Sequence, residues 1–273
     1  MDINILRKFE ADINRWVPGF KVCFKNESWF MLTLGFLVWP FNPGFMDQYV
    51  TTLGKTIWFP NFGYYSKDPE ASFTVLAHEY VHLYDSRRFP GWFQVSYMFP
   101  QILVALPLLV YAWLAGWHSW LMLVPILGYV LGCAVVQRSM AAFIAIITSA
   151  LAATIVTSFL LTGWETLVLV GGLALVAPWP APGRVHWEKR GYAMSIAVRM
   201  WLSGRPPSPD SLAYFERQFT GSNYFLMAWR AAPIRNALKG VVVRVSDNGL
   251  QDEKPYAQVH EFLYRHVLLA ARS

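Results

Sequence analysis

One segment of this sequence, an H-E-x-x-H motif, has residues of a type and spacing suited to metal chemistry. It runs from His78 through Glu79 to His82. Residues four apart share one face of an α-helix, so His78 and His82 can bind the same zinc ion. Zinc lowers the pKa of a bound water towards neutrality, and Glu79 can then take its proton as the water attacks a polarised carbonyl. The motif therefore predicts a zinc-dependent hydrolase in which Glu79 is the general base.

The residues on either side predict a helix that carries the whole motif. Asp68 can cap its first turn, and Pro69 suits the first helical position, where no backbone N–H is needed. The helix is expected to end at Arg88, because Pro90 cannot continue it. Both histidines then lie in the middle of a long helix, where their spacing has its geometric meaning.

A catalytic zinc ion needs a third protein ligand, and we expect this to be Glu188. It lies at the head of a helix predicted to begin at His186, and it follows His82 by 188 − 82 = 106 residues. Two alternatives remain open. Glu188 could instead pair with Arg184 or Tyr192, and His186 could then serve as the ligand in its place.

Asp85 lies on the same helix face as the histidines, three residues after His82. A helix rises about 1.5 Å per residue, so this short side chain stands too far along the axis to be a ligand. It could orient His82 or His78 through the distal ring nitrogen. It could equally pair with Arg88 at i+3.

The middle of the chain is nearly free of charge. Between Phe89 and Gly183 the only ionised side chains are Arg138 and Glu165. A hydrocarbon environment disfavours each ion by a few kcal/mol, so such a stretch predicts a bilayer-embedded segment. An even number of spans would return the chain to the side it left, which allows Glu188 to reach the histidines. The four predicted spans are near 94–113, 117–137, 140–162 and 164–181.

Three sections follow from this pattern. Residues 1–89 are predicted to form the first part of a metallopeptidase domain, residues 90–183 the membrane block, and residues 184–273 a helical part that completes the zinc site. The expected fold class is mainly α with a small β element, in a multi-spanning membrane protein. The predicted strands are Lys21–Phe24, Lys55–Phe59 and a short Val241–Val245.

The net charge of +6 lies entirely after the apolar block. Basic residues at the edges of membrane spans are typical of the cytoplasmic side, which is a better interpretation than nucleic-acid binding. The sequence therefore predicts a multi-pass integral membrane protein with its active site on the cytoplasmic side. The expected partners are a polypeptide substrate and the lipid bilayer, with no nucleic acid.

The motif helix, the apolar block and the later glutamate together resemble the membrane-embedded gluzincins, the group of the HtpX protease and the CaaX prenyl-protein proteases. The resemblance covers roughly residues 50–200. It implies a zinc metallopeptidase with His78, His82 and Glu188 as ligands and Glu79 as base. It also implies that Lys55–Phe59 is the edge strand that pairs with an extended substrate.

The sequence departs from that group four residues after Glu188, where gluzincins commonly carry an acidic residue and this chain has Tyr192. The group that orients the first histidine is therefore left open, and Asp85 is one candidate. Tyr192 or Arg190 could stabilise the oxyanion of the reaction. The competing hypothesis is a non-catalytic membrane scaffold, or a membrane-regulating protein, in which the motif is vestigial.

Overall fold

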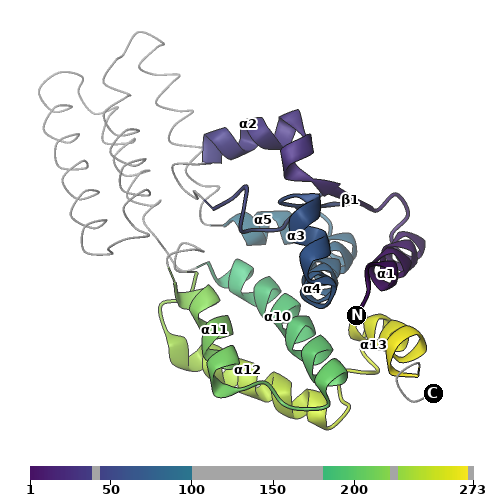
Figure 1. The fold of residues 1–273 in the computed structure, drawn as a ribbon. Helices are drawn as coiled ribbons and strands as arrows, with labels where there is room; N and C mark the ends of the chain where they lie inside the picture. Colours follow the sequence, from purple (N-terminus) through teal and green to yellow (C-terminus); the bar gives the residue numbers. More distant parts are fainter. Residues whose placement is uncertain (39–43, 100–180, 222–226, 270–273) are drawn as a thin grey trace, which may run out of the picture.

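The structure, a computed structural model, describes residues 1–38, 44–99, 181–221 and 227–269 (Figure 1). These residues are mainly helical, with one three-stranded sheet. The elements before the gap at residue 100 are α1 (Ile3–Trp16), β1 (Lys21–Phe24), η1 (Lys25–Glu27), α2 (Trp29–Val38), β2 (Thr51–Leu53), β3 (Thr56–Phe59), α3 (Phe62–Lys67), α4 (Pro69–Arg88) and α5 (Trp92–Met98). Those after it are α10 (Pro182–Ser203), α11 (Pro209–Thr220), α12 (Ala231–Ser246), α13 (Tyr256–Leu263) and the π-helical turn η5 (Tyr264–Leu268).

The sheet has the order β1-β3-β2, with β1 parallel and β2 antiparallel to the central strand β3. A tight connection at Gly54, whose φ is +62°, joins β2 to β3 because glycine tolerates this left-handed conformation. β2 is therefore the edge strand next to β3. The prediction that Lys55–Phe59 forms the edge strand is wrong, because strands lie on both sides of β3.

The helix α4 begins as its sequence predicts. The Asp68 carboxylate accepts hydrogen bonds from the backbone N–H groups of Glu70 at 3.1 Å and Ala71 at 3.0 Å. Pro69 occupies the first turn, and the helix ends at Arg88. The predicted bounds of the motif helix are confirmed.

Helices α4 and α10 pack against each other more extensively than any other pair of described elements. Figure 1 shows α10 between α4 on one side and the pair α11 and α12 on the other. On the far side of α4, the rings of Phe9 in α1, Phe73 in α4 and Phe262 in α13 form a cluster with centroids 4.5 to 5.8 Å apart. The pair α4 and α10 thus has packed helices on both of its sides.

The predicted membrane-spanning fold and multi-pass membrane localisation are corrected by the helices that the structure describes. None of them combines the length and the apolar character needed to cross a bilayer. A span needs about 20 mostly apolar residues. The long helices α4 and α10 have 20 and 22 residues but carry charges, whereas the apolar α2 has only 10. The predicted spans lie outside the described residues, except for their ends at 94–99 and 181.

The predicted strand Val241–Val245 is also wrong, because these residues belong to α12. A run of β-branched residues favours a strand when taken alone. In α12, however, the buried residues Ile234, Leu238 and Val245 recur at helical spacing, and their burial outweighs the local preference.

Candidate metal centre

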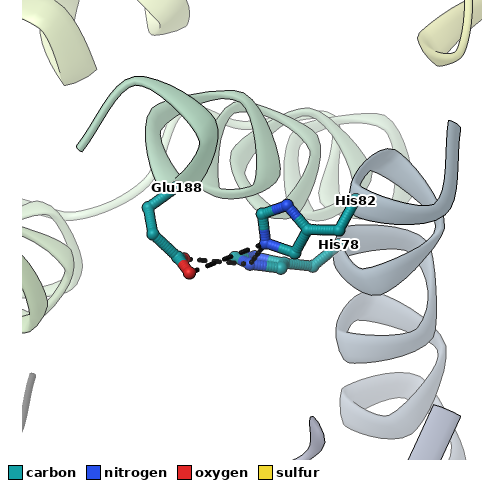
Figure 2. Close-up of side chains that lie close together, drawn as sticks. All are labelled: His78, His82 and Glu188. Atoms are coloured by element: carbon teal, nitrogen blue, oxygen red, sulfur yellow. Dashed lines mark hydrogen bonds and ion pairs between the residues drawn. The ribbon is translucent and has the colours of Figure 1, made fainter. Parts of the chain in front are cut away.

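Two ligand-type side chains of α4 and one of α10 meet at the centre of the helix pair. His78 and His82 project from α4 towards the carboxylate of Glu188 on α10, as Figure 2 shows. Their ring Nε2 atoms are 3.1 Å apart. Glu188 Oε2 lies 3.3 Å from His78 Nε2, and Glu188 Oε1 lies 3.7 Å from His82 Nε2. Among the described residues, these three form a group able to hold a metal ion.

The three separations fit a tetrahedral zinc site. With Zn–N and Zn–O distances near 2.1 Å, two ligand atoms of a tetrahedron are about 3.4 Å apart. The observed 3.1 Å between the two Nε2 atoms, 3.3 Å from His78 Nε2 to Glu188 Oε2 and 3.7 Å from His82 Nε2 to the other oxygen, Oε1, lie around that number. Two imidazoles and one carboxylate are also the donor set of many catalytic zinc sites, which leave the fourth position open. The residues present therefore fit the metal that the motif predicts.

The centre is buried, and Glu188 and His82 each shift the pKa of the other. Glu188 is 3% exposed, His82 5% and His78 9%. Burial alone would raise the pKa of Glu188, but hydrogen bonds from His78 and His82 outweigh it and hold that pKa well below its usual value. Burial alone would lower the pKa of His82, yet the hydrogen bond and charge of Glu188 raise it overall. A buried carboxylate that stays ionised favours a cation beside it, and a metal ion would supply that charge.

A hydroxyl group, rather than a carboxylate, contacts the far side of the first histidine. His78 Nδ1 lies 3.2 Å from Ser195 Oγ, and Ser195 is buried on α10. Ser195 follows Glu188 by seven residues, or two helical turns, so both face α4. Ser195 is thus the group that orients His78 in this chain. The Nδ1 atom of His82, by contrast, is buried without a hydrogen-bond partner in the described structure.

Gly191 explains how the two helices come close enough to form the centre. A Cβ atom at this position would lie 2.5 Å from His78 Nε2 and 2.7 Å from His78 Cε1. Carbon and nitrogen atoms in ordinary contact are about 3.5 Å apart. Only glycine leaves room for the imidazole here, so Gly191 sets the distance between α10 and the first histidine.

A strand of the sheet holds the side chain of Glu79 in place. Thr52 on β2 donates a hydrogen bond from its hydroxyl to Glu79 Oε2 at 2.6 Å. Glu79 is half-buried and follows His78 directly in α4, and its charge contributes to the raised pKa of His82. One carboxylate oxygen is thus fixed by the edge strand.

Asp85 does not reach either histidine. Its two oxygens accept hydrogen bonds from Arg190, at 2.7 Å from Nε and 3.0 Å from the terminal nitrogen. Asp85 is fully buried, and Arg190 is on α10. Neither sequence alternative for Asp85, orienting a histidine or pairing with Arg88, matches this contact. The ion pair of Asp85 and Arg190 instead joins α4 to α10 about one turn beyond His82. The guanidinium group of Arg190, a candidate for stabilising the oxyanion, is therefore bound to Asp85.

The other predicted site residues lie around the centre without joining the metal group. Tyr192 is buried, and its ring meets that of His78 edge-on with centroids 4.8 Å apart. His186 packs against Trp187 and lines a cavity of about 540 Å³ between the start of α10, α5 and the end of α4. Arg184 lies over the ring of Tyr97 rather than beside Glu188.

Four residues of the site were missed by sequence reasoning: Thr52, Tyr97, Gly191 and Ser195. The spacing of Gly191 and Ser195, three and seven residues after Glu188, places them on one helix face and could have indicated them. Thr52 lies in a strand of three residues, and Tyr97 lies within the first predicted span, 94–113. Neither position has a periodic signal.

Comparisons of this chain with protein-family models, with curated proteins and with solved structures find no match. The geometry of the centre therefore carries the functional assignment.

Proposed function

We propose that this protein is a zinc metallopeptidase in which His78, His82 and Glu188 hold the metal and Glu79 is the general base. The observation that carries the proposal is the close approach of two imidazole nitrogens, 3.1 Å apart, to the Glu188 carboxylate, at 3.3 and 3.7 Å, on two helices that the chain brings together across 106 residues. A carboxylate next to the first ligand in sequence is the second requirement, and Glu79 meets it.

The geometry of Glu79 suits proton transfer. A zinc ion in the centre would supply Lewis-acid activation of water and of the substrate carbonyl. Thr52 occupies one Glu79 oxygen at 2.6 Å, so the other oxygen remains to accept a proton. A base fixed in this way needs less reorganisation before it reacts. Because Glu79 is only half-buried, it can also contact a substrate.

The edge strand β2 is the element best placed to hold a polypeptide. Thr52 ties this strand to Glu79, and among the strands that the structure describes only β3 pairs with it, on one side. An extended peptide that adds to the free edge of β2 would lie beside the base, with backbone hydrogen bonds giving affinity without a fixed sequence. The substrate class we propose is therefore an extended or unfolded polypeptide segment.

Peptide cleavage by zinc-loaded protein tests the proposal against a metal-binding protein without activity. Wild type and Glu79→Gln are loaded with zinc and incubated with casein and with a mixture of unstructured peptides. We expect both proteins to bind zinc equally and only wild type to cleave. Glu70→Gln is the matched control, because Glu70 is an exposed carboxylate on the same helix and should leave cleavage unchanged.

Equal cleavage by wild type and Glu79→Gln would remove Glu79 from the mechanism. Stoichiometric zinc with no cleavage by either protein would favour the non-catalytic alternative.

A further inference from the structure

A hydroxyl group from a third helix reaches the carboxylate of Glu188. Tyr97 on α5 donates a hydrogen bond to Glu188 Oε1 at 2.5 Å. The other oxygen, Oε2, is the one closest to His78 Nε2, at 3.3 Å. The ring of Tyr97 is also 6.0 Å from that of His82. Three helices, not two, therefore converge on the centre.

The position of Tyr97 is fixed by packing between α5 and the start of α10. Its ring stacks on Phe93 with centroids 5.6 Å apart, and Phe93 in turn packs against Trp187 at 5.1 Å. Trp187 Nε1 donates to Ser96 Oγ at 2.8 Å, and Arg184 Nε donates to the backbone carbonyl of Tyr97 at 3.2 Å. The hydroxyl is therefore presented to Glu188 by a packed unit rather than by a freely rotating side chain.

The two oxygens of Glu188 are made unequal by this contact. A carboxylate can bind zinc through one oxygen or through both, and a strong hydrogen bond to one oxygen favours the first mode. Oε1 accepts the hydrogen bond from Tyr97 and lies 3.7 Å from His82 Nε2, whereas Oε2 lies closer to an imidazole, at 3.3 Å from His78 Nε2. With a single oxygen from Glu188, the protein supplies three ligand atoms and leaves the fourth position free.

We propose that Tyr97 is a positioning residue that restricts Glu188 to one-oxygen coordination of the metal. The inference rests on the proposed zinc site, but it is independent of whether the loaded protein cleaves peptides. It assigns the phenol a role that the motif does not contain, because Tyr97 reaches Glu188 from α5, outside the two helices that carry the three metal-binding side chains.

Zinc affinity and the visible spectrum of the Co²⁺-substituted protein test this role. In Tyr97→Phe the hydroxyl is lost and the ring is kept. We expect zinc, measured by competition with a chelator, to bind about 10 to 100-fold more weakly, as for other groups that hold a metal ligand. We also expect the Co²⁺ absorption to weaken as the coordination number rises. The matched control is Tyr264→Phe, because Tyr264 is exposed and lies on η5.

A double-variant cycle separates positioning from a general packing effect. If Tyr97 acts through Glu188, Tyr97→Phe should have little further effect on zinc affinity in a Glu188→Asp background, where a carboxylate is kept but is shorter by one methylene group. An equal loss in both backgrounds, or a Tyr97→Phe protein with wild-type affinity and spectrum, would overturn the proposal. Wild type that binds zinc but does not cleave would refute only the peptidase function, whereas wild type that binds no zinc would refute both.

Discussion

Replacing Gly191 by alanine is the sharpest structural test of how the helix pair builds the centre. The new methyl group would lie 2.5 Å from His78 Nε2. Ordinary contact needs about 3.5 Å, so the imidazole or α10 must move by about 1 Å. Metal–ligand distances tolerate about 0.2 Å. The displacement is thus several times larger than a zinc site accepts.

The expected loss in Gly191→Ala is at least about 100-fold in zinc affinity, or about 2.8 kcal/mol at 1.4 kcal/mol per tenfold. The free energy of unfolding of the metal-free protein should fall by less, at most about 2.5 kcal/mol. Alanine favours a helix interior over glycine by about 0.5 to 1 kcal/mol, and the overpacking costs about 1 to 3 kcal/mol. A chelator competition assay measures the affinity, and denaturant unfolding of the metal-free protein measures the free energy of unfolding.

Gly240→Ala is the matched control, because a Cβ atom at this position in α12 would meet nothing within 4 Å. It should leave zinc affinity unchanged and stabilise the fold by about 0.5 to 1 kcal/mol. If Gly191→Ala binds zinc as tightly as wild type, the close approach of α10 to His78 is not a feature of the centre and the reasoning fails.

Three further outcomes follow from the contacts around the site. Thr52→Val should lower kcat for peptide cleavage about tenfold with zinc affinity unchanged, because the hydroxyl that holds Glu79 is lost; equal kcat would refute it. Ser195→Ala should weaken zinc binding about 10 to 100-fold, measured by chelator competition, because His78 loses its orienting hydroxyl; an unchanged affinity would contradict it. Burial lowers the pKa of Lys25 to about 8 from 10.5, against the opposing charges of Glu79 and Asp47. The folded protein then binds fewer protons than the unfolded chain across that window, so the free energy of unfolding should rise with pH between 8 and 10.5. Denaturant unfolding across this range should show the rise in wild type and a smaller one in Lys25→Met; equal slopes would rule it out.

The motif helix could be predicted from sequence because its signals are local. Asp68 and Pro69 specify where the helix begins, and Pro90 specifies where it ends, without help from tertiary contacts. The spacing of the two histidines then places them on one helix face. The strand Lys21–Phe24 was also predicted with the bounds that the structure shows. Glu188 was named because a zinc ion needs a third ligand, and the structure places it beside both imidazoles.

The contacts between elements could not be predicted in this way. Arg190 was one of two candidates for stabilising the oxyanion, yet its partner is Asp85 on the other helix, a contact that depends on how α4 and α10 are packed. The contact of Tyr97 with Glu188 likewise depends on the packing of α5 against α10. The apolar character of the middle of the chain was read as a membrane fold, whereas the long helices that the structure describes are charged and carry the site.

Metal analysis of the purified chain tests the central claim most directly. After incubation with zinc and removal of the excess, wild type should retain one zinc ion per chain. His82→Ala and Glu188→Ala should each retain little or none, and His186→Ala, a nearby histidine outside the metal group, should match wild type. Wild type without stoichiometric zinc, or His82→Ala and Glu188→Ala proteins that keep it, would contradict a metal centre made by these three side chains.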